Sequence, residues 1–158
     1  MPHSIDALSW HWHAIDEMSP QAVYALLQLR ARVFVVEQNC PYLDADGKDL
    51  LPGVQQLAAW SEQHMVACLR LIPPGQSFAE RSLGRIVTAP EWRGSGLGHR
   101  LVERGLAYCQ QHWPGEPVRI GAQSHLQGFY RQHGFEIASE PYLEDDIPHV
   151  EMVCQLNA

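Results

Sequence analysis

A glycine-rich turn carries the strongest chemical signal in the sequence. Its residues, Arg93-Gly94-Ser95-Gly96-Leu97-Gly98, follow an apolar run at 83–88 and open an amphipathic stretch at 97–109. Glycines let the backbone come close to an anion, and the first turn of a helix offers unpaired N–H groups and the positive end of the helix dipole. The segment therefore predicts a strand–turn–helix unit that could cradle a phosphate or pyrophosphate group.

Three familiar motifs do not fit this turn. A P-loop ends in Gly-Lys-Ser/Thr, whereas Gly98 is followed by His99 and Arg100. A Rossmann turn needs its third glycine at position 99 and belongs to the first βα unit. A nucleophile elbow has the pattern Gly-x-Ser-x-Gly, whereas Ser95 has glycine directly on both sides. A plain structural turn without a ligand is the alternative interpretation.

A tyrosine downstream could supply a proton. Tyr130 lies in the segment Phe129-Tyr130-Arg131-Gln132-His133-Gly134-Phe135, which follows a short apolar strand and reads as a short helix ended by glycine. A tyrosine hydroxyl is protonated at neutral pH, so it can act as a general acid toward a leaving group. The alternative is that Tyr130 only packs in the core with its hydroxyl satisfied.

Taken together, these motifs resemble the GNAT N-acetyltransferase superfamily. Arg93, Gly96 and Gly98 match its pattern Arg/Gln-x-x-Gly-x-Gly/Ala, and Tyr130 with Gly134 and Phe135 matches its pattern Tyr-x-x-x-Gly-Phe. Three longer segments look like the ElaA-type branch of these proteins: 26–42, 121–127 and 142–150. The resemblance extends along nearly the whole chain.

The resemblance implies acetyl-CoA as cosubstrate and a role for each matching residue. It implies that the turn holds the pyrophosphate, that the strand before it pairs with the pantetheine arm, and that Tyr130 protonates the departing thiolate. The implied cofactor-binding residues are Ile86, Val87, Thr88, Arg93, Gly94, Ser95, Gly96, Leu97 and Gly98. Gln123 stands where many family members carry an asparagine that helps hold the cofactor, so we expect a polar role for it.

The implied reaction is direct transfer of an acetyl group, in a ternary complex, to a primary amine of a small molecule or peptide. The alternative is a module of the same fold that binds acyl-CoA without turnover. A nucleotide- or phosphate-binding protein is a third interpretation, against which the missing motifs above argue.

Two residues are candidates for the base or for binding the acceptor. In the implied fold the strand at 150–156 runs antiparallel to the strand at 118–122, which brings His149 close to the reacting group. A free histidine titrates near 6.5, which suits a base. Glu37 ends the first helix, where the helix dipole disfavours a carboxylate, so it is expected to have another role. A strand cap for His149 and a solvated helix end for Glu37 are the alternatives.

Other polar clusters give weaker signals. Asp44, Asp46 and Asp49 do not have the spacing of a calcium loop, so we expect side-chain caps of a turn. An acidic mouth that attracts a cationic amine is a further hypothesis, to which Asp145 and Asp146 could add. His11 and His13 could be two metal ligands on one strand, but no third ligand lies nearby in sequence, and no metal is expected.

The elements that must position these residues follow from the hydrophobic patterns. Alternation and apolar runs predict strands, and three- and four-residue steps predict helices. The expected strands are 8–14, 54–60, 65–72, 83–88, 118–122, 135–138 and 150–156, and the expected helices are 20–37, 97–109 and 124–133. This order predicts an α/β (α+β) protein with a central mixed, mostly antiparallel sheet of six or seven strands flanked by helices.

Composition sets the outer limits. The 158 residues with 46% hydrophobic content predict a single domain, 1–158, that folds without disulfides or metals. A net charge of −7 argues against partners such as nucleic acid or anionic membrane. The four cysteines form no Cys-x-x-Cys motif, and we see neither a signal peptide nor a membrane span, so a reducing cytoplasm is expected. Exposed Trp and Leu on an edge strand could mediate a homodimer.

Overall fold

The computed structural model describes residues 4–158, and its internal contacts divide the chain into two compact units. The first unit comprises the chain up to Leu71 together with Arg85–Val102. The second unit comprises Ile72–Gly84 and Glu103–Ala158. Strand β4 and helix α2 contribute residues to both units, and the single domain expected from the sequence stays a prediction.

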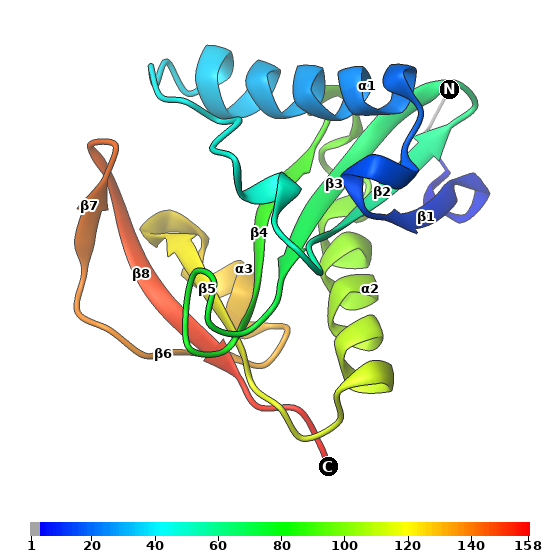
Figure 1. Cartoon of the computed structure of the whole chain (residues 1–158). Coiled ribbons are helices and arrows are strands. Elements are labelled where there is room, and N and C mark those ends of the chain that lie inside the picture. Colours follow the sequence, from blue (N-terminus) through cyan, green and yellow to red (C-terminus); the bar gives the residue numbers. More distant parts are fainter. Residues whose placement is uncertain (1–3) are drawn as a thin grey trace. The chain divides into compact units, whose positions relative to one another are not determined.

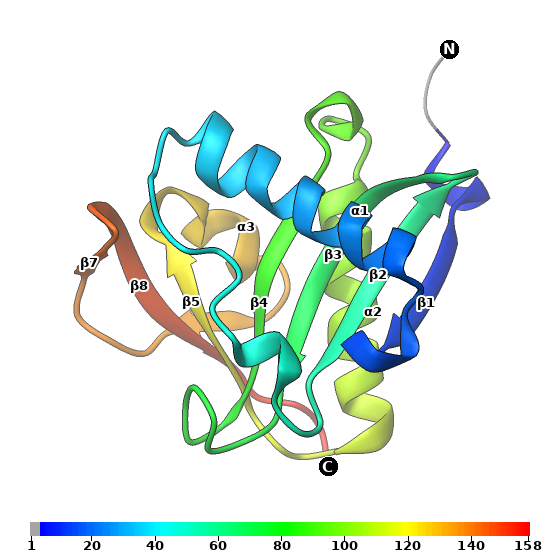
Figure 2. The same cartoon turned by 45° about the horizontal axis from the view of Figure 1, so that its top comes forward.

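Three antiparallel strands and helix α1 make up the main part of the first unit. Strand β1 (Ser9–His13) pairs with β2 (Gln55–Ser61), which pairs with β3 (His64–Ile72). Helix α1 (Pro20–Arg30) lies across one face of this ladder, as the two views of the chain show (Figures 1 and 2). Leu26, Leu57 and Leu69, from the helix and two of the strands, are fully buried.

Helix α1 begins at a regular cap and continues into a π-helical segment. Ser19 accepts the N–H of Ala22 at 3.1 Å, and Pro20 occupies the first helical position. Residues Ala31–Glu37 are π-helical, and the N–H of Gln38 reaches five residues back to the carbonyl of Val33. The helix predicted at 20–37 therefore has the right ends, but its last two turns are wider than an α-helix. Such segments are rare and are often found at functional sites.

A buried arginine fixes the loop that follows. Arg30, at the last α-helical position, is completely buried. Its Nε donates to Oδ2 of Asp44 at 2.9 Å, and its Nη1 donates to Oδ1 of Asp49 at 2.7 Å. Gln56 of β2 adds a hydrogen bond from its Nε2 to Asp49 at 2.8 Å. Because a buried charge is tolerated only when it is paired and hydrogen-bonded, these contacts hold residues 44–49 against the ladder.

Two further arginines complete this cluster. Arg70 of β3 donates to both carboxylate oxygens of Asp46, at 2.9 and 3.1 Å. Nε of Arg85 lies 2.8 Å from Oδ1 of Asp44, and its Nη2 lies 3.2 Å from Oδ2 of Asp46. Three aspartates therefore face three arginines. The hypothesis that Asp44, Asp46 and Asp49 form an acidic mouth is wrong, because each of their charges is neutralised by a partner distant in sequence.

Strand β4 (Arg81–Thr88) has an irregular backbone at Arg85. The φ angle of Arg85 is +47°, in the left-handed region that side-chain-bearing residues rarely adopt. Such a conformation costs about 1–3 kcal/mol and persists only where its surroundings hold it. The ion pairs of Arg85 with Asp44 and Asp46 provide that hold.

The second unit contains five strands of mixed direction. The first residues of β4 pair in parallel with β5 (Val118–Gln123), in two residue pairs that involve Arg81 and Ser82. Strand β8 (Ile147–Cys154) runs antiparallel to β5, β6 (Phe135–Ile137) and β7 (Tyr142–Glu144). Figure 1 shows the hairpin of β7 and β8 at the orange and red end of the chain.

The predicted mixed, mostly antiparallel fold is confirmed, with eight strands among the described residues where six or seven were expected. The additional strand is β7, which has only three residues. Strand β8 also begins three residues earlier than predicted, because Ile147 and Pro148 face β7 in a tight hairpin.

The two remaining helices begin close to their predicted positions. Helix α2 (Leu97–His112) buries Leu97 and Leu101 in the first unit and Cys109 in the second. Helix α3 (Gln127–Arg131) is shorter than predicted, since 124–126 form a 3₁₀ turn before it. All four cysteines are buried, and none of them forms a disulfide. None of the helices within residues 4–158 is both long and apolar enough to cross a membrane.

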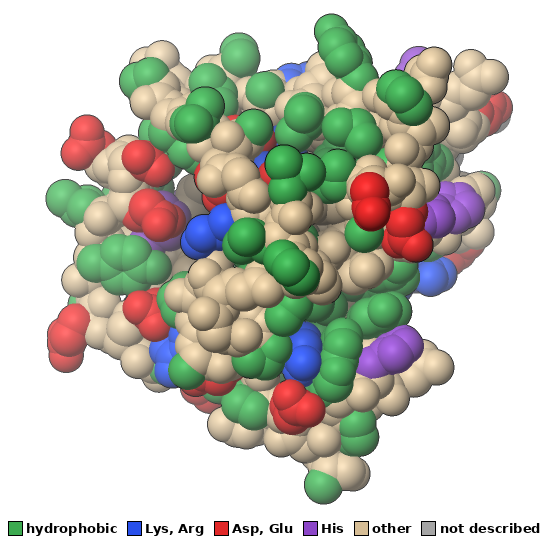
Figure 3. All heavy atoms as spheres, viewed as in Figure 1, with side chains coloured by type: hydrophobic (Ala, Val, Ile, Leu, Met, Phe, Trp, Pro, Cys, Tyr) green, Lys and Arg blue, Asp and Glu red, His purple; other side chains and the backbone are tan. Residues whose placement is uncertain are grey.

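The exposed apolar residues of the first unit lie on α1 and on the segment after it. Figure 3 shows hydrophobic side chains over the upper part of the view, where Figure 1 draws these elements. The large exposed apolar side chains of these elements are Tyr24, Val36, Leu43, Leu50 and Leu51. On β1, where the sequence suggested a dimer edge, Trp10 and Trp12 are half-buried. The homodimer stays a prediction.

Replacing Asp49 by Asn tests the cluster. The substitution keeps the shape of the side chain but leaves Arg30 and Arg70 with one carboxylate fewer, so the free energy of unfolding should fall by about 3 kcal/mol. Urea denaturation measures it. The matched control, Asp16→Asn at an exposed site, should change stability by less than about 0.5 kcal/mol.

The same experiment has a pH dependence. Burial alone would raise the pKa of Asp46, but hydrogen bonds from Arg70 and from the Lys48 N–H outweigh it and lower the pKa to about 2. Burial likewise opposes the hydrogen bond and charge of Arg30, which lower the pKa of Asp49. Their stabilisation is complete above about pH 4 and is lost as the pH falls towards 2. The difference between Asp49→Asn and the parent should shrink over this range, and a constant difference would contradict the assignment.

Candidate functional site

The predicted site residues fall into two groups, one in each unit. The first unit contains the glycine-rich turn, residues 86–88 and Glu37. The second unit contains Gln123, Tyr130 and His149.

The turn has the backbone that its glycines predict. Gly94 and Gly96 have φ angles of +80° and +86°, which only glycine adopts without strain. A Cβ atom on Gly94 would have no neighbour within 4 Å, and one on Gly96 would meet only Ile5, at 3.9 Å. Open space therefore lies beside the main chain at both positions, so a ligand can approach the backbone closely there.

Hydrogen bonds of Ser95 and of the first turn of α2 fix the rest of the glycine-rich turn. The Ser95 hydroxyl donates to the carbonyl of Trp92 and accepts the N–H of Leu97 at 3.3 Å. The first helical hydrogen bond of α2 runs from the N–H of Arg100 to the carbonyl of Gly96. The 16 residues of α2 align their peptide dipoles, so the turn lies at the positive end of a long helix. The arrangement has the features of an anion-binding helix N-terminus.

Arg93 and Glu37, predicted for different roles, bind each other. Nη1 and Nη2 of Arg93 donate to the two carboxylate oxygens of Glu37, at 2.8 and 2.6 Å. This hydrogen-bonded pairing lowers the pKa of Glu37, so its carboxylate is a weaker base than a free glutamate. The π-helical segment thus ends beside the turn, and Arg32 on the same segment binds Glu91 at 2.7 Å. Two ion pairs connect this helix to residues 91–93.

The side chains of the last residues of β4 alternate between buried and partly exposed positions. Val87 is buried in the first unit, whereas Ile86 and Thr88 are partly exposed. Directly after them, the N–H of Ala89 donates to the carbonyl of Val66 in β3 at 2.8 Å. Arg85, whose backbone is left-handed, comes immediately before Ile86. The direction of residues 86–88 is therefore set by an irregular conformation in the middle of the strand.

Tyr130 is the most deeply buried of the predicted site residues in the second unit. It is 6% exposed, and its ring makes edge contacts with Phe129 and Phe135, with centroids 5.1 and 5.9 Å apart. Burial raises its pKa well above the ordinary value for tyrosine. The hydroxyl is therefore protonated over the whole physiological pH range, as a proton donor requires.

His149 of β8 and Gln123 of β5 are directly opposite each other on neighbouring strands. The register of β5 and β8 pairs these two residues, so the predicted antiparallel arrangement is confirmed. On its other side His149 is opposite Tyr142 of β7, whose ring stacks on the imidazole with centroids 5.8 Å apart. Its Nε2 lies 3.5 Å from Oε2 of Glu144.

Sequence reasoning missed Tyr142 and Glu144. Gly121 could have signalled them, because a Cβ atom there would come within 3.1 Å of the Tyr142 hydroxyl. The glycine gives that hydroxyl room rather than providing an unusual backbone angle.

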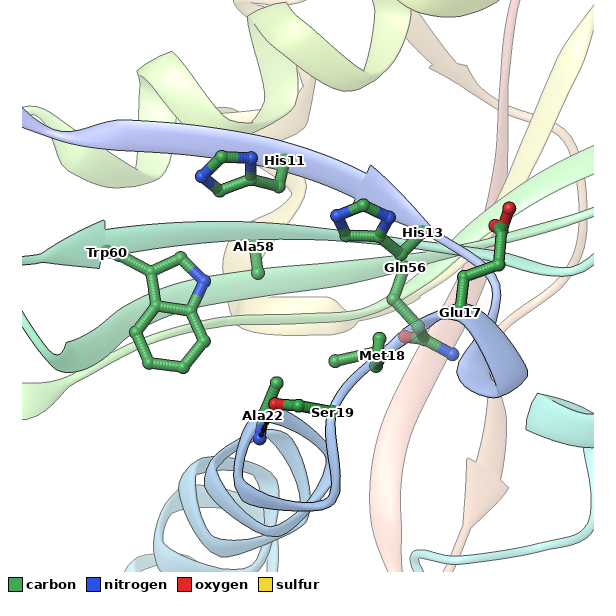
Figure 4. A pocket seen from close by; sticks show the side chains of 9 residues that line it. All are labelled: His11, His13, Glu17, Met18, Ser19, Ala22, Gln56, Ala58 and Trp60. Carbon is green, nitrogen blue, oxygen red and sulfur yellow. Dashed lines mark hydrogen bonds between the residues drawn. The ribbon is translucent and has the colours of Figure 1, made fainter.

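One further pocket lies apart from the predicted residues. It has a volume of about 210 Å³ and lies between β1, β2 and the start of α1 (Figure 4). His11 and His13 line it together with Glu17 and Trp60, and their two imidazoles stack 5.9 Å apart. Within residues 4–158, no group of three or more His, Cys, Asp or Glu residues is arranged to hold a metal ion.

Comparisons with known proteins agree with this geometry. The family model described as acetyltransferase (GNAT) domain matches residues 16–156. Protein ElaA of Escherichia coli is 41% identical over 145 residues, which cover 92% of this chain and 95% of that protein. The crystal structure of E. coli ElaA superposes with a TM-score of 0.88 at 40% identity, over 94% of this chain and 99% of that one.

Two other solved structures are similar. An acyl-CoA N-acyltransferase from Pseudomonas aeruginosa has a TM-score of 0.88 and 44% identity, over 93% of this chain and 99% of that one. An acetyltransferase of the GNAT family from Elizabethkingia anophelis, solved with acetyl-CoA bound, shares the fold with a TM-score of 0.62 at 18% identity, over 96% of this chain and 99% of that one.

The burial of Tyr130 predicts a silent tyrosine in an alkaline titration. Because its hydroxyl stays protonated, Tyr130→Phe should leave the tyrosinate absorbance unchanged relative to the parent up to about pH 11, one unit above the ordinary tyrosine pKa. Ultraviolet difference spectra measure this. A variant that loses the signal of one tyrosinate below that pH would show that Tyr130 is accessible to water.

Proposed function

This chain belongs to the GNAT acetyltransferase family, and on that premise we propose that it transfers an acetyl group from acetyl-CoA to a primary amine. The transfer is direct and takes place in a ternary complex of protein, acetyl-CoA and acceptor. The acceptor is a small molecule or a peptide.

The observation that carries the proposal is the backbone of the turn. Gly94 and Gly96 are left-handed, have open space where side chains would be, and lie at the start of a helix of 16 residues. The pyrophosphate of acetyl-CoA carries the negative charge that such a helix start favours. In this proposal the backbone of Arg93–Gly98 holds the pyrophosphate, and Glu37 fixes the orientation of the Arg93 side chain beside it.

The end of β4 is proposed to hold the pantetheine arm. Its parallel ladder with β5 comprises the pairs at Arg81 and Ser82. Backbone groups of Ile86, Val87 and Thr88, beyond that ladder, are in our proposal the partners of the amides of the pantetheine. The fixed conformation of Arg85 supports this role, because it orients the residues that follow.

Tyr130 is proposed as the general acid. Collapse of the tetrahedral intermediate breaks the C–S bond and releases a thiolate, which takes the hydroxyl proton of Tyr130. The raised pKa supports the role, since the donor is fully protonated before the step. A module that only senses acyl-CoA would need no such acid.

A base must also take a proton from the amine. His149 is the better of the two predicted candidates, because Arg93 lowers the pKa of Glu37 and weakens it as a base. Gln123, the register partner of His149, is proposed to contribute a polar contact to the cofactor or acceptor.

Ligand-dependent thermal stability tests the cofactor site. Acetyl-CoA and CoA should raise the melting temperature and ATP should not, since a ligand at 100 times its Kd adds about 2.7 kcal/mol of stability. If millimolar acetyl-CoA leaves the melting temperature unchanged, residues 93–98 are only a structural turn and do not bind the cofactor.

A matched glycine pair sharpens this test. Gly96→Ala places a methyl group in the turn, and we expect the Kd for acetyl-CoA to rise by about tenfold or more. Gly75→Ala has the same φ of +86°, and a Cβ atom there meets nothing within 4 Å, so it carries the same backbone cost of about 1–2 kcal/mol at a site away from the turn. Calorimetric titration should show parental affinity for Gly75→Ala. Equal losses in both variants would mean that strain alone explains the effect.

Replacing Tyr130 by Phe separates catalysis from binding. The variant keeps the buried ring but has no proton to donate, so kcat should fall about 10²–10⁴-fold at an unchanged Kd for acetyl-CoA. Thiol release with an amine acceptor measures the rate. Tyr24→Phe, at an exposed tyrosine of α1, is the control and should behave as the parent. Parental activity of Tyr130→Phe would show that Tyr130 is not the general acid, whereas a parent protein that binds acetyl-CoA without thiol release would favour the sensing module.

A further inference from the structure

Strands β5, β7 and β8 bring four polar side chains to one face of the sheet. Tyr142 of β7, His149 of β8 and Gln123 of β5 are successive register partners, so their side chains form a row across three strands. Glu144 lies two residues after Tyr142 and therefore on the same face. Opposite this row, Ala122, Val150 and Met152 point into the core of the unit.

The hydrogen bonds of His149 define its tautomer. Nδ1 lies 2.7 Å from the carbonyl oxygen of Ile147, and a carbonyl can only accept, so Nδ1 carries the proton. In the neutral ring Nε2 is then an acceptor. The side chain is 9% exposed and its ring stacks on Tyr142, so both the tautomer and the orientation are fixed.

A second acceptor lies beside Nε2. Oε2 of Glu144 is 3.5 Å from Nε2, beyond the usual length of a direct hydrogen bond, while the Glu144 side chain is 61% exposed. Two acceptors at this separation, one buried and one open to solvent, fit a donor that can bond to both. A primary ammonium group has three N–H donors and a positive charge, and therefore fits this pair.

The charges around the hairpin favour a cation. Asp145 and Asp146 form its two-residue turn, both with positive φ, and neither Lys nor Arg occurs between Tyr142 and Glu151. Glu151, on the same face as His149, is paired with Arg119 at 2.9 Å. Glu144 and Tyr142 of β7 lie beside His149, and Glu151 lies two residues further along β8.

We propose that Tyr142, Glu144 and His149 form the binding site for the ammonium group of the acceptor, with Nε2 of His149 as the atom that takes its proton. This proposal rests on the proposed acetyl transfer and assigns its acceptor end. Glu144 binds the cation and then stabilises the imidazolium. Tyr142 is a positioning residue, which holds the imidazole by stacking.

The protons balance in this scheme. The nitrogen of R–NH₃⁺ loses one proton to His149, which passes it to solvent. The free amine attacks the thioester carbon, the C–N bond forms and the C–S bond breaks. The nitrogen then loses its second proton to solvent, and Tyr130, which gave its own proton to the thiolate, takes one back from solvent. The products are the amide, CoA–SH and one proton released to solvent.

An amine titration followed on His149 tests the site without turnover. In protein labelled with ¹⁵N-histidine, at a pH above the ordinary histidine range, the ring should show the Nδ1–H tautomer, and n-butylamine should shift its resonances. Butyramide and butyrate, which have the same chain but no ammonium, should not. The His149→Gln variant identifies the resonance among the nine histidines.

Glu144→Gln should weaken the binding of n-butylamine about tenfold, as expected when a charged hydrogen bond becomes a neutral one. Glu140→Gln, an exposed glutamate just before β7, is the control and should bind as the parent. With the best amine acceptor, Glu144→Gln should raise KM more than it lowers kcat.

The role of Tyr142 has a rescue test. Gly121→Ala should displace the Tyr142 hydroxyl and weaken amine binding, and adding Tyr142→Phe should restore it by removing the clash. A histidine resonance that no amine shifts, or a Glu144→Gln variant with parental amine affinity, would overturn the proposal. Failure of the acetyl transfer would instead appear as a missing thermal shift with acetyl-CoA, which the amine titration does not involve.

Discussion

The desolvation of one guanidinium group is the constraint on which the first unit depends. Arg30 has no exposed surface, and an ion in that position is stable only with counter-charges in contact. Asp44 and Asp49 can supply them only if the segment after the helix folds back onto the ladder. Those carboxylates then accept Arg70 and Arg85 from two strands. One buried charge therefore determines the path of an otherwise irregular loop.

The same cluster reaches the candidate cofactor strand. Arg85 is bound to Asp44 and Asp46 and also has the strained backbone that precedes residues 86–88. Its strain is compensated by ion pairs whose other members belong to the loop. On the neighbouring side, Glu37 binds Arg93 at the start of the glycine turn. The helix, its π-helical end and the loop thus act together on the backbone proposed to bind acetyl-CoA.

Local patterns in the sequence predicted the fold and the turn well. The strand–turn–helix unit around Gly94 and Gly96 follows from glycine conformation and hydrophobic spacing, both of which are local properties. The ion cluster could not be predicted, because Arg30 and Asp49 are 19 residues apart and nothing local pairs them. An acidic run alone suggested an open charged mouth, and the structure shows a neutralised one.

Other features also lie outside local reasoning. The π-helical segment has nearly the same apolar spacing as an α-helix, so periodicity does not distinguish them. Strand β7 is too short to show alternation, and its residues acquire meaning only opposite His149. The importance of Gly121 depends on a tyrosine that is distant in sequence and adjacent in space. In each of these cases the structure depends on contacts between residues that are distant in sequence, which local patterns do not show.

The arginine–aspartate cluster also shapes the electric field outside the protein. Its three arginines and three aspartates cancel one another, which leaves eight basic and fifteen acidic residues to act on the surroundings. An anionic ligand therefore approaches against a repulsive field and is attracted only close to its binding site. Added salt screens the long-range repulsion over about 10 Å at 0.1 M, so the association of such a ligand is faster at moderate ionic strength than in dilute buffer.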